Sequence, residues 1–230
     1  MELLRLKTEV LDANLELVRR GLVLYTFGNA SGIDRASGLV AIKPSGVPYE
    51  QMTAADMVIC DLSGKIIDGR LKPSSDIETH LELYRSWPAI GGVVHTHSES
   101  ATAWAQAGRD IPALGTTHAD YFYGPVPATE ELTTEEIQGE YELNTGKAIV
   151  RRFSGIDPAA MPAVLVAGHA PFTWGKTPSD AAHNAVILEY VARMASTTVL
   201  IRPNGKGVSQ ALLDRHYFRK HGAQATYGQN

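Results

Sequence analysis

Two short apolar runs of the chain each lead into histidine, and this feature constrains the fold more than any other. The run 90–94 ends at His95 and His97, and the run 164–167 leads through a glycine to His169. Because side chains alternate along a strand, histidines two positions apart point to the same side. Three imidazoles at neighbouring strand ends would form a ligand set that leaves one coordination position open, as catalytic zinc sites do. A histidine pair alone is more often packed or surface histidine, so the prediction of a metalloenzyme depends on the rest of the chain.

Length and composition favour one domain. The chain has 230 residues, 44% of them hydrophobic, which is enough to bury a core. No Pro/Ser/Gly-rich linker, block of like charges or internal repeat divides it. We therefore expect a single α/β layered domain over residues 1–230.

Charge and cysteine content exclude several classes of protein. A net charge of -4 without a polybasic stripe argues against nucleic acid as a partner. Cys60 is the only cysteine, so neither an intrachain disulfide nor a Cys-rich zinc ribbon is expected. The N-terminus turns charged too soon for a signal peptide, and no apolar run approaches the ~18 residues of a membrane span. We expect a cytoplasmic protein that does not bind membranes.

The hydrophobic pattern predicts helices alternating with short strands. Ser75 and Glu78 have the spacing of a capping box, and Gly21, Gly108 and Gly146 are placed to end helices. Helices are expected over 2–20, from 75 through 84, from 98 to Gly108, from 133 to Gly146, from 177 through 194 and over 212–222. Strands are expected over 38–42, 57–62 and 66–67, with a flexible tail over 223–230.

Two serine-containing segments have the composition of phosphate cradles. They are 43–46, which follows a strand, and 72–75, which precedes a helix. Oxyanions bind well at a helix N-terminus, where unpaired amides and the positive end of the dipole converge. Each segment alone is more often a simple turn or cap. Their occurrence together, beside a histidine cluster, favours an anionic substrate.

Other polar groups leave alternatives open. Asp76, in the first turn of a helix, either compensates the dipole or ligates the metal. Asp120 is either a general acid/base or a solvated loop carboxylate. His80, His118 and His183 lack ligand spacing and are expected to be packed, hydrogen-bonded histidines. The usual glycine-rich signals of dinucleotide and ATP sites are absent, as is a Gly-x-Ser-x-Gly elbow, so no organic cofactor is expected.

Short motifs along the chain together indicate a family. They are Gly28-Asn29-Ala30-Ser31, Ile42-Lys43-Pro44-Ser45-Gly46, Lys72-Pro73-Ser74-Ser75-Asp76, His95-Thr96-His97-Ser98 and Gly168-His169-Ala170-Pro171-Phe172. In this order they resemble the class II aldolase/epimerase family over essentially the whole chain. The segments 115–124, 216–222 and 227–229 resemble its L-ribulose-5-phosphate 4-epimerase branch in particular. Ala30 stands where valine is typical, a departure that should not affect the chemistry.

The resemblance implies a three-layer α/β/α fold around a mostly antiparallel sheet. It also implies a divalent metal, most often Zn²⁺, with Mn²⁺ or Co²⁺ as alternatives, and a cyclic homotetramer with sites between neighbouring subunits. The matched metal ligands are His95, His97 and His169, with Asp76 as a fourth. The matched substrate and phosphate contacts are Gly28, Asn29, Lys43, Ser45, Gly46, Ser74, Ser75 and Arg219. Asp120 and Tyr227 match an acid/base pair supplied by the adjoining subunit, supported by Thr116, Glu142 and His216.

The chemistry of a 2-ketopentose 5-phosphate suits this set of groups. The hydrogen on C4 is not adjacent to the carbonyl, so its removal would leave a carbanion without resonance support. Without a nicotinamide site to oxidise C4, the economical route breaks the C3–C4 bond, rotates the glycolaldehyde phosphate fragment and re-forms the bond. The expected activity is therefore interconversion of L-ribulose 5-phosphate and D-xylulose 5-phosphate, serving arabinose or ascorbate-type sugar use.

Two other functions remain open. One is a class II aldolase that releases its aldehyde, such as one acting on L-fuculose 1-phosphate. The other is a non-catalytic, adducin-like assembly module, against which the retention of all three histidines argues.

Overall fold

A single antiparallel sheet organises the molecule. The computed structural model describes residues 3–222 and 225–226. Its seven strands have the order β4-β3-β2-β1-β5-β7-β6, and every neighbouring pair is antiparallel. They are β1 (Asn29–Asp34), β2 (Leu39–Ile42), β3 (Val58–Asp61), β4 (Ile66–Asp68), β5 (Gly92–His95), β6 (Ala163–Leu165) and β7 (Pro171–Gly175).

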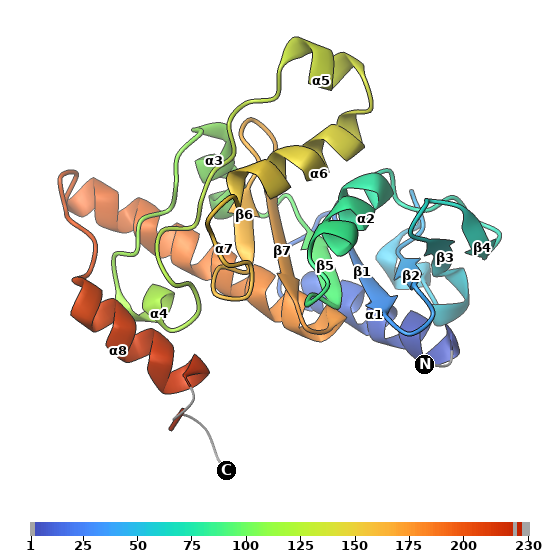
Figure 1. Ribbon diagram of the computed structural model, residues 1–230, viewed down its shortest axis with the longest axis horizontal. Coiled ribbons are helices and arrows are strands. Elements are labelled where there is room, and N and C mark those ends of the chain that lie inside the picture. Colours follow the sequence, from blue (N-terminus) through green and yellow to red (C-terminus); the bar gives the residue numbers. More distant parts are fainter. Residues whose placement is uncertain (1–2, 223–224, 227–230) are drawn as a thin grey trace.

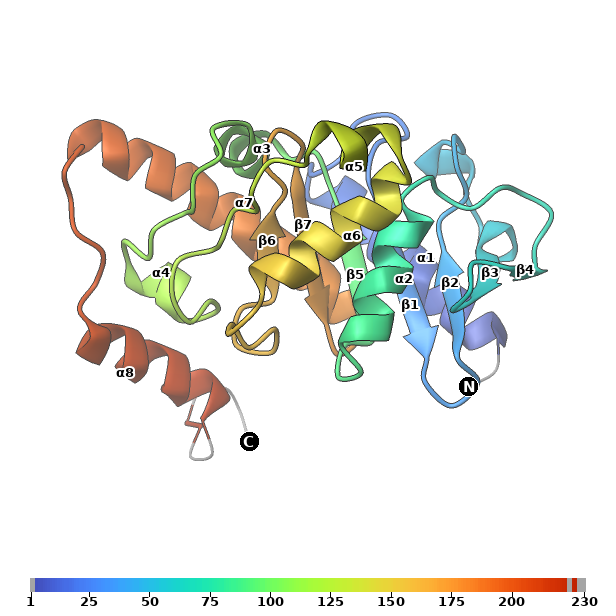
Figure 2. The ribbon, with the colours of Figure 1, turned by 45° about the horizontal axis from the view of Figure 1, so that its top comes forward.

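Helices cover both faces of the sheet, as Figures 1 and 2 show. Helices α1 (Leu3–Arg19) and α7 (Pro178–Ile201) pack on one face, and α2 (Ile77–Ser86) and α6 (Tyr141–Arg152) lie together over the other. The remaining helices are α3 (Glu99–Gln106), α4 (Thr116–Ala119), α5 (Thr134–Gln138) and α8 (Gln210–His221), with short 3-10 turns at Tyr49–Gln51 and Ala54–Asp56. This arrangement confirms the predicted α/β/α fold with an antiparallel sheet.

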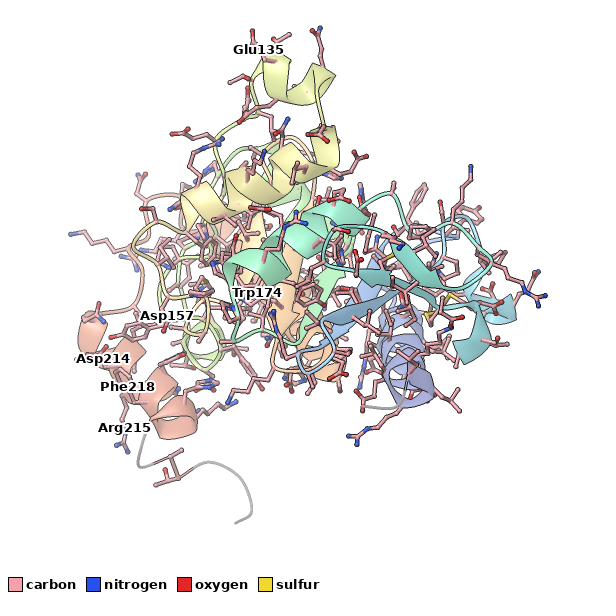
Figure 3. All side chains as sticks on the ribbon, turned by 45° about the vertical axis from the view of Figure 1, so that its right-hand side comes forward. Glu135, Asp157, Trp174, Asp214, Arg215 and Phe218 are labelled. Carbon is pink, nitrogen blue, oxygen red and sulfur yellow. The ribbon has the colours of Figure 1, made fainter. Side chains whose placement is uncertain are left out.

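Helices α4 and α8 pack against each other at one end of the molecule, beyond β6. Figure 3 shows Asp214, Arg215 and Phe218 along α8 at the periphery, whereas Trp174 of β7 lies in the interior. In the described residues, no helix is both long and apolar enough to cross a bilayer.

Strand β5 decides which way the predicted histidines face. Val94 packs with residues of α1 and α7, such as Leu17 and Ala181. Because side chains alternate, Val93 turns to the opposite face, where it packs with Leu81 and Tyr84 of α2, and His95 follows it there. The end of β5 thus presents a histidine to the face that α2 and α6 cover.

Strand β1 is absent from the strands expected above, and its sequence explains why. The segment 29–34 has no alternating apolar pattern, although all six of its residues are buried. Gly32 has helix side chains on top of it: an added Cβ would lie 2.6 Å from Pro178 of α7 and 3.0 Å from Val10 of α1. Close helix packing therefore takes the place of large strand side chains.

The prediction of one helix from 133 to Gly146 is wrong. This segment forms two helices, α5 and α6, and Gly146 lies inside α6. An added Cβ at Gly146 would lie 2.7 Å from the Cβ of Glu82, so this glycine permits the close approach of α2 and α6 instead of ending a helix.

The capping box at Ser75 and Glu78 is also not formed. Helix α2 begins at Ile77 with Asp76 as its N-cap, and no side chain caps it. The carboxylate of Asp76 instead accepts a hydrogen bond from Asn29 at 2.6 Å.

Candidate metal centre and phosphate cavity

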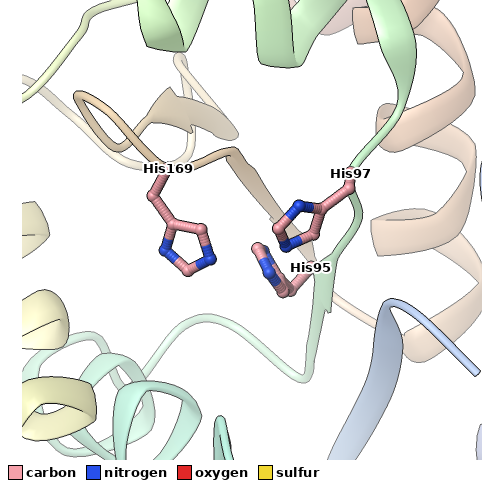
Figure 4. Close-up of side chains that lie close together, drawn as sticks. All are labelled: His95, His97 and His169. Atoms are coloured by element: carbon pink, nitrogen blue, oxygen red, sulfur yellow. The ribbon is translucent and has the colours of Figure 1, made fainter.

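Three histidines converge at one end of β5 and β7. The ring centroid of His95 lies 4.9 Å from those of both His97 and His169, and the latter two are 5.1 Å apart. One potential ligand atom from each residue lies within 4.8 Å of the others. Figure 4 shows the three rings around a common space. The convergence expected from the strand-end positions is therefore present.

Local backbone structure brings the rings together. His95 ends β5 and is paired across the sheet with Asn29 of β1 and Phe172 of β7. His97 follows two residues later. His169 lies in the tight β6–β7 turn, which closes with the Val166 amide donating to the Ala170 carbonyl at 3.0 Å. Gly168 precedes it with a φ of 70°, a conformation that favours glycine.

The donor atoms suit a divalent cation. Nδ1 of His95 donates to the carbonyl of Pro171 at 3.0 Å, because a carbonyl can only accept. Its Nε2 therefore keeps a lone pair. Burial lowers the pKa of His95 to about 3, and burial also lowers the pKa values of His97 and His169. Imidazoles must be neutral to bind a metal, so burial keeps these three ready to do so.

Asp76 lies beside the histidines but is bonded elsewhere. Burial alone would raise the pKa of its carboxyl, but the neighbouring His95 and His80 and the amide of Asn29 outweigh burial and lower it. Its carboxylate accepts a short hydrogen bond from Asn29, and the converging set comprises only the three histidines among the described residues. A role as fourth ligand stays a prediction.

The histidines line a cavity of about 420 Å³ that also holds both serine segments. The segments 43–46 and 72–75 are joined, because the Ser45 amide donates to the Lys72 carbonyl and the Ser74 amide to the Lys43 carbonyl, each at 2.9 Å. The other predicted residues that line the cavity are Gly28, Asn29, Lys43, Ser45, Gly46, Ser74, Ser75, Asp76 and Glu142.

Lys43 places a buried cation beside this cavity. It is only 2% exposed, and burial lowers its pKa. Its Nζ donates to the carbonyls of Thr26 and Pro44, both at 3.3 Å, and lies 4.8 Å from the centroid of the Tyr49 ring. Within the described residues it forms no ion pair with a carboxylate. An anion bound in the cavity would supply the negative charge that the Lys43 ammonium group lacks.

Asn29 offers an unused acceptor. Its Nδ2 donates to Ser74 Oγ at 3.0 Å and to the carboxylate of Asp76. Its Oδ1 is buried and has no hydrogen-bond partner. Since buried polar atoms are rarely left unsatisfied, this oxygen is suited to accept a bond from a bound hydroxyl group.

Asp120 lies in a second cluster, at the contact of α4 and α8. It accepts hydrogen bonds from Arg219 at 2.8 Å to 3.1 Å and from His216 Nδ1 at 3.0 Å. Burial alone would raise the pKa of Asp120, but these bonds and the charges of Lys220 and Arg219 hold it below its ordinary value. Thr116 begins α4 and accepts a bond from the Asp120 amide through its carbonyl. None of these residues lines the histidine cavity, and Tyr227 lies outside the described residues.

Two further residues at the site have no signal in the sequence. Tyr141 lines the cavity with its hydroxyl 3.4 Å from His169 Nδ1, and Phe27 lies beside His97 with ring centroids 6.2 Å apart. An aromatic residue at the start of a helix or in a turn has no distinguishing pattern. His80 and His118 are buried and bonded to Ser31 and to the carbonyl of Gly124, respectively, as packed histidines. His183 is exposed, so the expectation of a packed histidine is wrong there.

Solved structures of known proteins share this fold. An L-fuculose 1-phosphate aldolase is 26% identical, with a TM-score of 0.77 over 92% of this chain and 94% of that one. The L-fuculose-1-phosphate aldolase of Thermus thermophilus is also 26% identical, with a TM-score of 0.66 over 89% of this chain and 99% of that one. YgbL from Klebsiella pneumoniae, at 24% identity, shares the fold with a TM-score of 0.74 over 94% of this chain and 99% of that one.

A sequence-family match covers most of the chain. Residues 8–196 match the Class II Aldolase and Adducin N-terminal domain, a range that includes both serine segments and all three converging histidines. The chain therefore belongs to the class II aldolase/adducin family.

Proposed function

We propose that this protein is a metal-dependent sugar-phosphate 4-epimerase that interconverts L-ribulose 5-phosphate and D-xylulose 5-phosphate. One observation carries the proposal: three neutral, converging imidazoles and two joined serine segments line the same cavity. The first group suits a cation that activates a carbonyl, and the second suits a phosphate. Membership of the class II aldolase/adducin family supports chemistry on a phosphorylated sugar.

His95, His97 and His169 would hold the metal, for which we propose Zn²⁺, with Mn²⁺ or Co²⁺ as alternatives. Such a cation supplies a Lewis acid that polarises the substrate ketone and offsets the negative charge released when the C3–C4 bond breaks. No organic cofactor is required for this route.

The serine segments would bind the 5-phosphate. Ser45, Ser74 and Ser75 bring hydroxyl groups to the cavity, and α2 begins two residues after Ser75, so the positive end of its dipole adds to the attraction. Lys43 supplies a full positive charge. The unused Oδ1 of Asn29 would accept a bond from a substrate hydroxyl.

Phosphate retention is what makes the reaction an epimerisation. After C3–C4 cleavage, the aldehyde fragment must turn over and be attacked on its opposite face without leaving. If both serine segments bind the phosphate, the aldehyde fragment can rotate about it without leaving the cavity.

A second copy of the chain would complete the site. The C4 oxygen needs a proton donor and acceptor on each face, which we assign to Asp120 and Tyr227 of the neighbouring subunit, one for each epimer. The lowered pKa of Asp120 keeps its carboxylate ionised at neutral pH. Arg219 and His216 hold it, and Thr116 and Glu142 support the site. We therefore propose a homotetramer with active sites between subunits.

An aldolase that releases its product is the second candidate. The likeness to L-fuculose 1-phosphate aldolase structures at 26% identity favours it. The two functions share the cavity and differ in whether the aldehyde fragment escapes.

Product analysis separates them. Metal-loaded protein is incubated with L-ribulose 5-phosphate, with a chelator-treated sample as control. D-xylulose 5-phosphate formed only in the metal-loaded sample supports the epimerase. Accumulation of free glycolaldehyde phosphate identifies the aldolase, and no turnover of either kind contradicts the proposal.

A further inference from the structure

The ring of Phe172 stacks directly on a predicted metal ligand. Phe172 and His95 are cross-strand partners on β7 and β5. Their ring centroids are 4.2 Å apart and their planes differ by 21°. Both side chains are almost fully buried, at 1% and 2% exposure. A flat, buried stack of this kind restricts the tilt of the imidazole.

The stack complements a hydrogen bond that His95 donates to Pro171, the residue before Phe172. The Pro171 carbonyl accepts from Nδ1 of His95 and so determines which nitrogen faces the other histidines. That bond alone leaves the ring free to tilt about the Nδ1 to oxygen direction. The face of Phe172 removes this freedom, so two consecutive residues fix both the direction and the plane of the ligand ring.

Phe172 is itself held in place. His80 contacts it edge-on, with ring centroids 6.0 Å apart and an interplanar angle of 71°. Nδ1 of His80 is bonded to Ser31 Oγ at 2.7 Å, and the same oxygen is bonded to the Tyr84 hydroxyl at 2.8 Å. His80 and Ser31 are fully buried, and Tyr84 is 1% exposed. This network, rooted in β1 and α2, supports the phenylalanine from the side of the core.

The same ring also reaches the second ligand-bearing segment. His169 contacts Phe172 with centroids 6.4 Å apart and an interplanar angle of 78°. One side chain therefore touches two of the three converging histidines, one on β5 and one in the β6–β7 turn. A leucine would fill similar space but offers no flat face to either imidazole.

We propose that Phe172 is a positioning residue of the metal centre, which orients the imidazoles of His95 and His169 so that their lone pairs meet. This inference rests on the metal centre of the proposed function. What the inference adds is that metal affinity depends on the phenyl ring. In other metal sites, affinity likewise depends on residues that contact the ligands without touching the metal.

Two phenylalanine variants separate orientation from general stability. Phe172→Leu removes the stacked ring, and Phe153→Leu is its matched control. Phe153 is 5% exposed and packs against Trp87 and Trp174, with ring centroids 5.2 Å and 5.1 Å away. Phe172→Met, an unbranched apolar replacement without a ring, takes the place of Phe172→Leu if that variant does not fold.

The measurement is the dissociation constant of Zn²⁺, obtained by chelator competition on the full chain, together with the visible absorption spectrum of the Co²⁺-loaded protein. We expect Phe172→Leu to weaken Zn²⁺ binding about tenfold and to change the Co²⁺ spectrum. Phe153→Leu should lower the unfolding temperature of the metal-free protein comparably, with Zn²⁺ affinity and the Co²⁺ spectrum unchanged.

Two results would overturn the inference while leaving the metal centre intact: wild-type affinity in Phe172→Leu, or equal weakening in both variants. Failure of the unaltered protein to bind Zn²⁺ or Co²⁺ would overturn the metal centre itself, and the inference with it.

Discussion

The histidine cavity and the Asp120 cluster differ in almost every physical respect. The cavity at the end of β5 holds three imidazoles with lowered pKa values, of which His95 is buried, His169 half-buried and His97 exposed. It also holds an unused amide oxygen and a buried lysine without a carboxylate partner in the described residues. The cluster between α4 and α8 holds an ionised carboxylate satisfied by Arg219, His216 and Lys220. The cavity has binding groups in need of a ligand, whereas the cluster has charges already matched to one another.

This difference indicates a division of work. The cavity can hold a cation and a phosphate within one protomer. The groups proposed to move protons lie apart from it on α4 and α8, or beyond the described residues. The contrast is what an active site built from two copies of the chain would produce.

Removal of a cavity histidine should have the largest effect. His95→Ala loses a ligand and its metal, and turnover should fall about 10⁴-fold, since a Lewis acid contributes several kcal/mol to such a reaction. Metal content by elemental analysis and turnover of L-ribulose 5-phosphate measure this. His183→Ala, an exposed histidine, is the control for metal content and should retain the ion. Metal retained in His95→Ala would show that the ion binds elsewhere.

Changes in the proton-transfer groups should have the next largest effect and leave the metal in place. Asp120→Asn and Tyr227→Phe should each reduce epimerisation about 10³-fold, within the range for loss of a general acid or base. Elemental analysis should show unchanged metal content. Full activity in either variant would remove that residue from the mechanism.

Lys43 tests the phosphate half of the cavity. Lys43→Met should raise KM about a hundredfold, because a buried charge-assisted contact with phosphate contributes roughly 1.5 to 3 kcal/mol. Steady-state kinetics measure this, and inhibition by inorganic phosphate should weaken in parallel. Lys65→Met, at an exposed position just after a turn, is the control. An unchanged KM would place the phosphate elsewhere.

Buried histidines other than the three converging ones should make the stability of the metal-free protein depend on pH. Burial lowers the pKa values of His80 and His118 to about 4, below the ordinary value of 6.5. As the pH falls from 6.5 towards 4, the unfolded chain takes up protons that the folded protein does not, so folding loses free energy. Between about pH 6.5 and 5 the loss should be roughly 1.5 kcal/mol for each such histidine.

Urea unfolding of the chelator-treated protein at the two pH values measures this loss. His118→Asn should make the pH dependence shallower, since one such group is then gone. A stability that does not change over this range would contradict the neutral, buried state of these histidines.

The sequence was most informative where a short-range rule decides position. Strand alternation predicts that His95 and His97 face the same side, and His169 near another strand end completes a candidate set. The two serine segments were each recognisable, but the hydrogen bonds that join 43–46 to 72–75 are long-range and have no local signal.

Tertiary packing accounts for what could not be predicted. Gly32 permits close packing of helices on strand β1, so this strand lacks the alternating apolar pattern that would have predicted it. Gly146 permits the close approach of α2 and α6, so it does not mark the end of a helix as predicted. The supporting ring of Phe172 acts through a cross-strand contact that no motif identifies. The separation of Asp120 from the cavity depends on how α4 and α8 pack against each other.

The most direct test of this division of work combines two inactive variants. His95→Ala subunits retain Asp120, and Asp120→Asn subunits retain the histidines, so each protein alone should be inactive. If active sites form between subunits, random mixed oligomers from co-expression should recover about one quarter of the wild-type activity, because one neighbour pair in four combines an intact triad with an intact Asp120. Mixed oligomers as inactive as both parents would show that both groups must come from one chain, and would contradict the account.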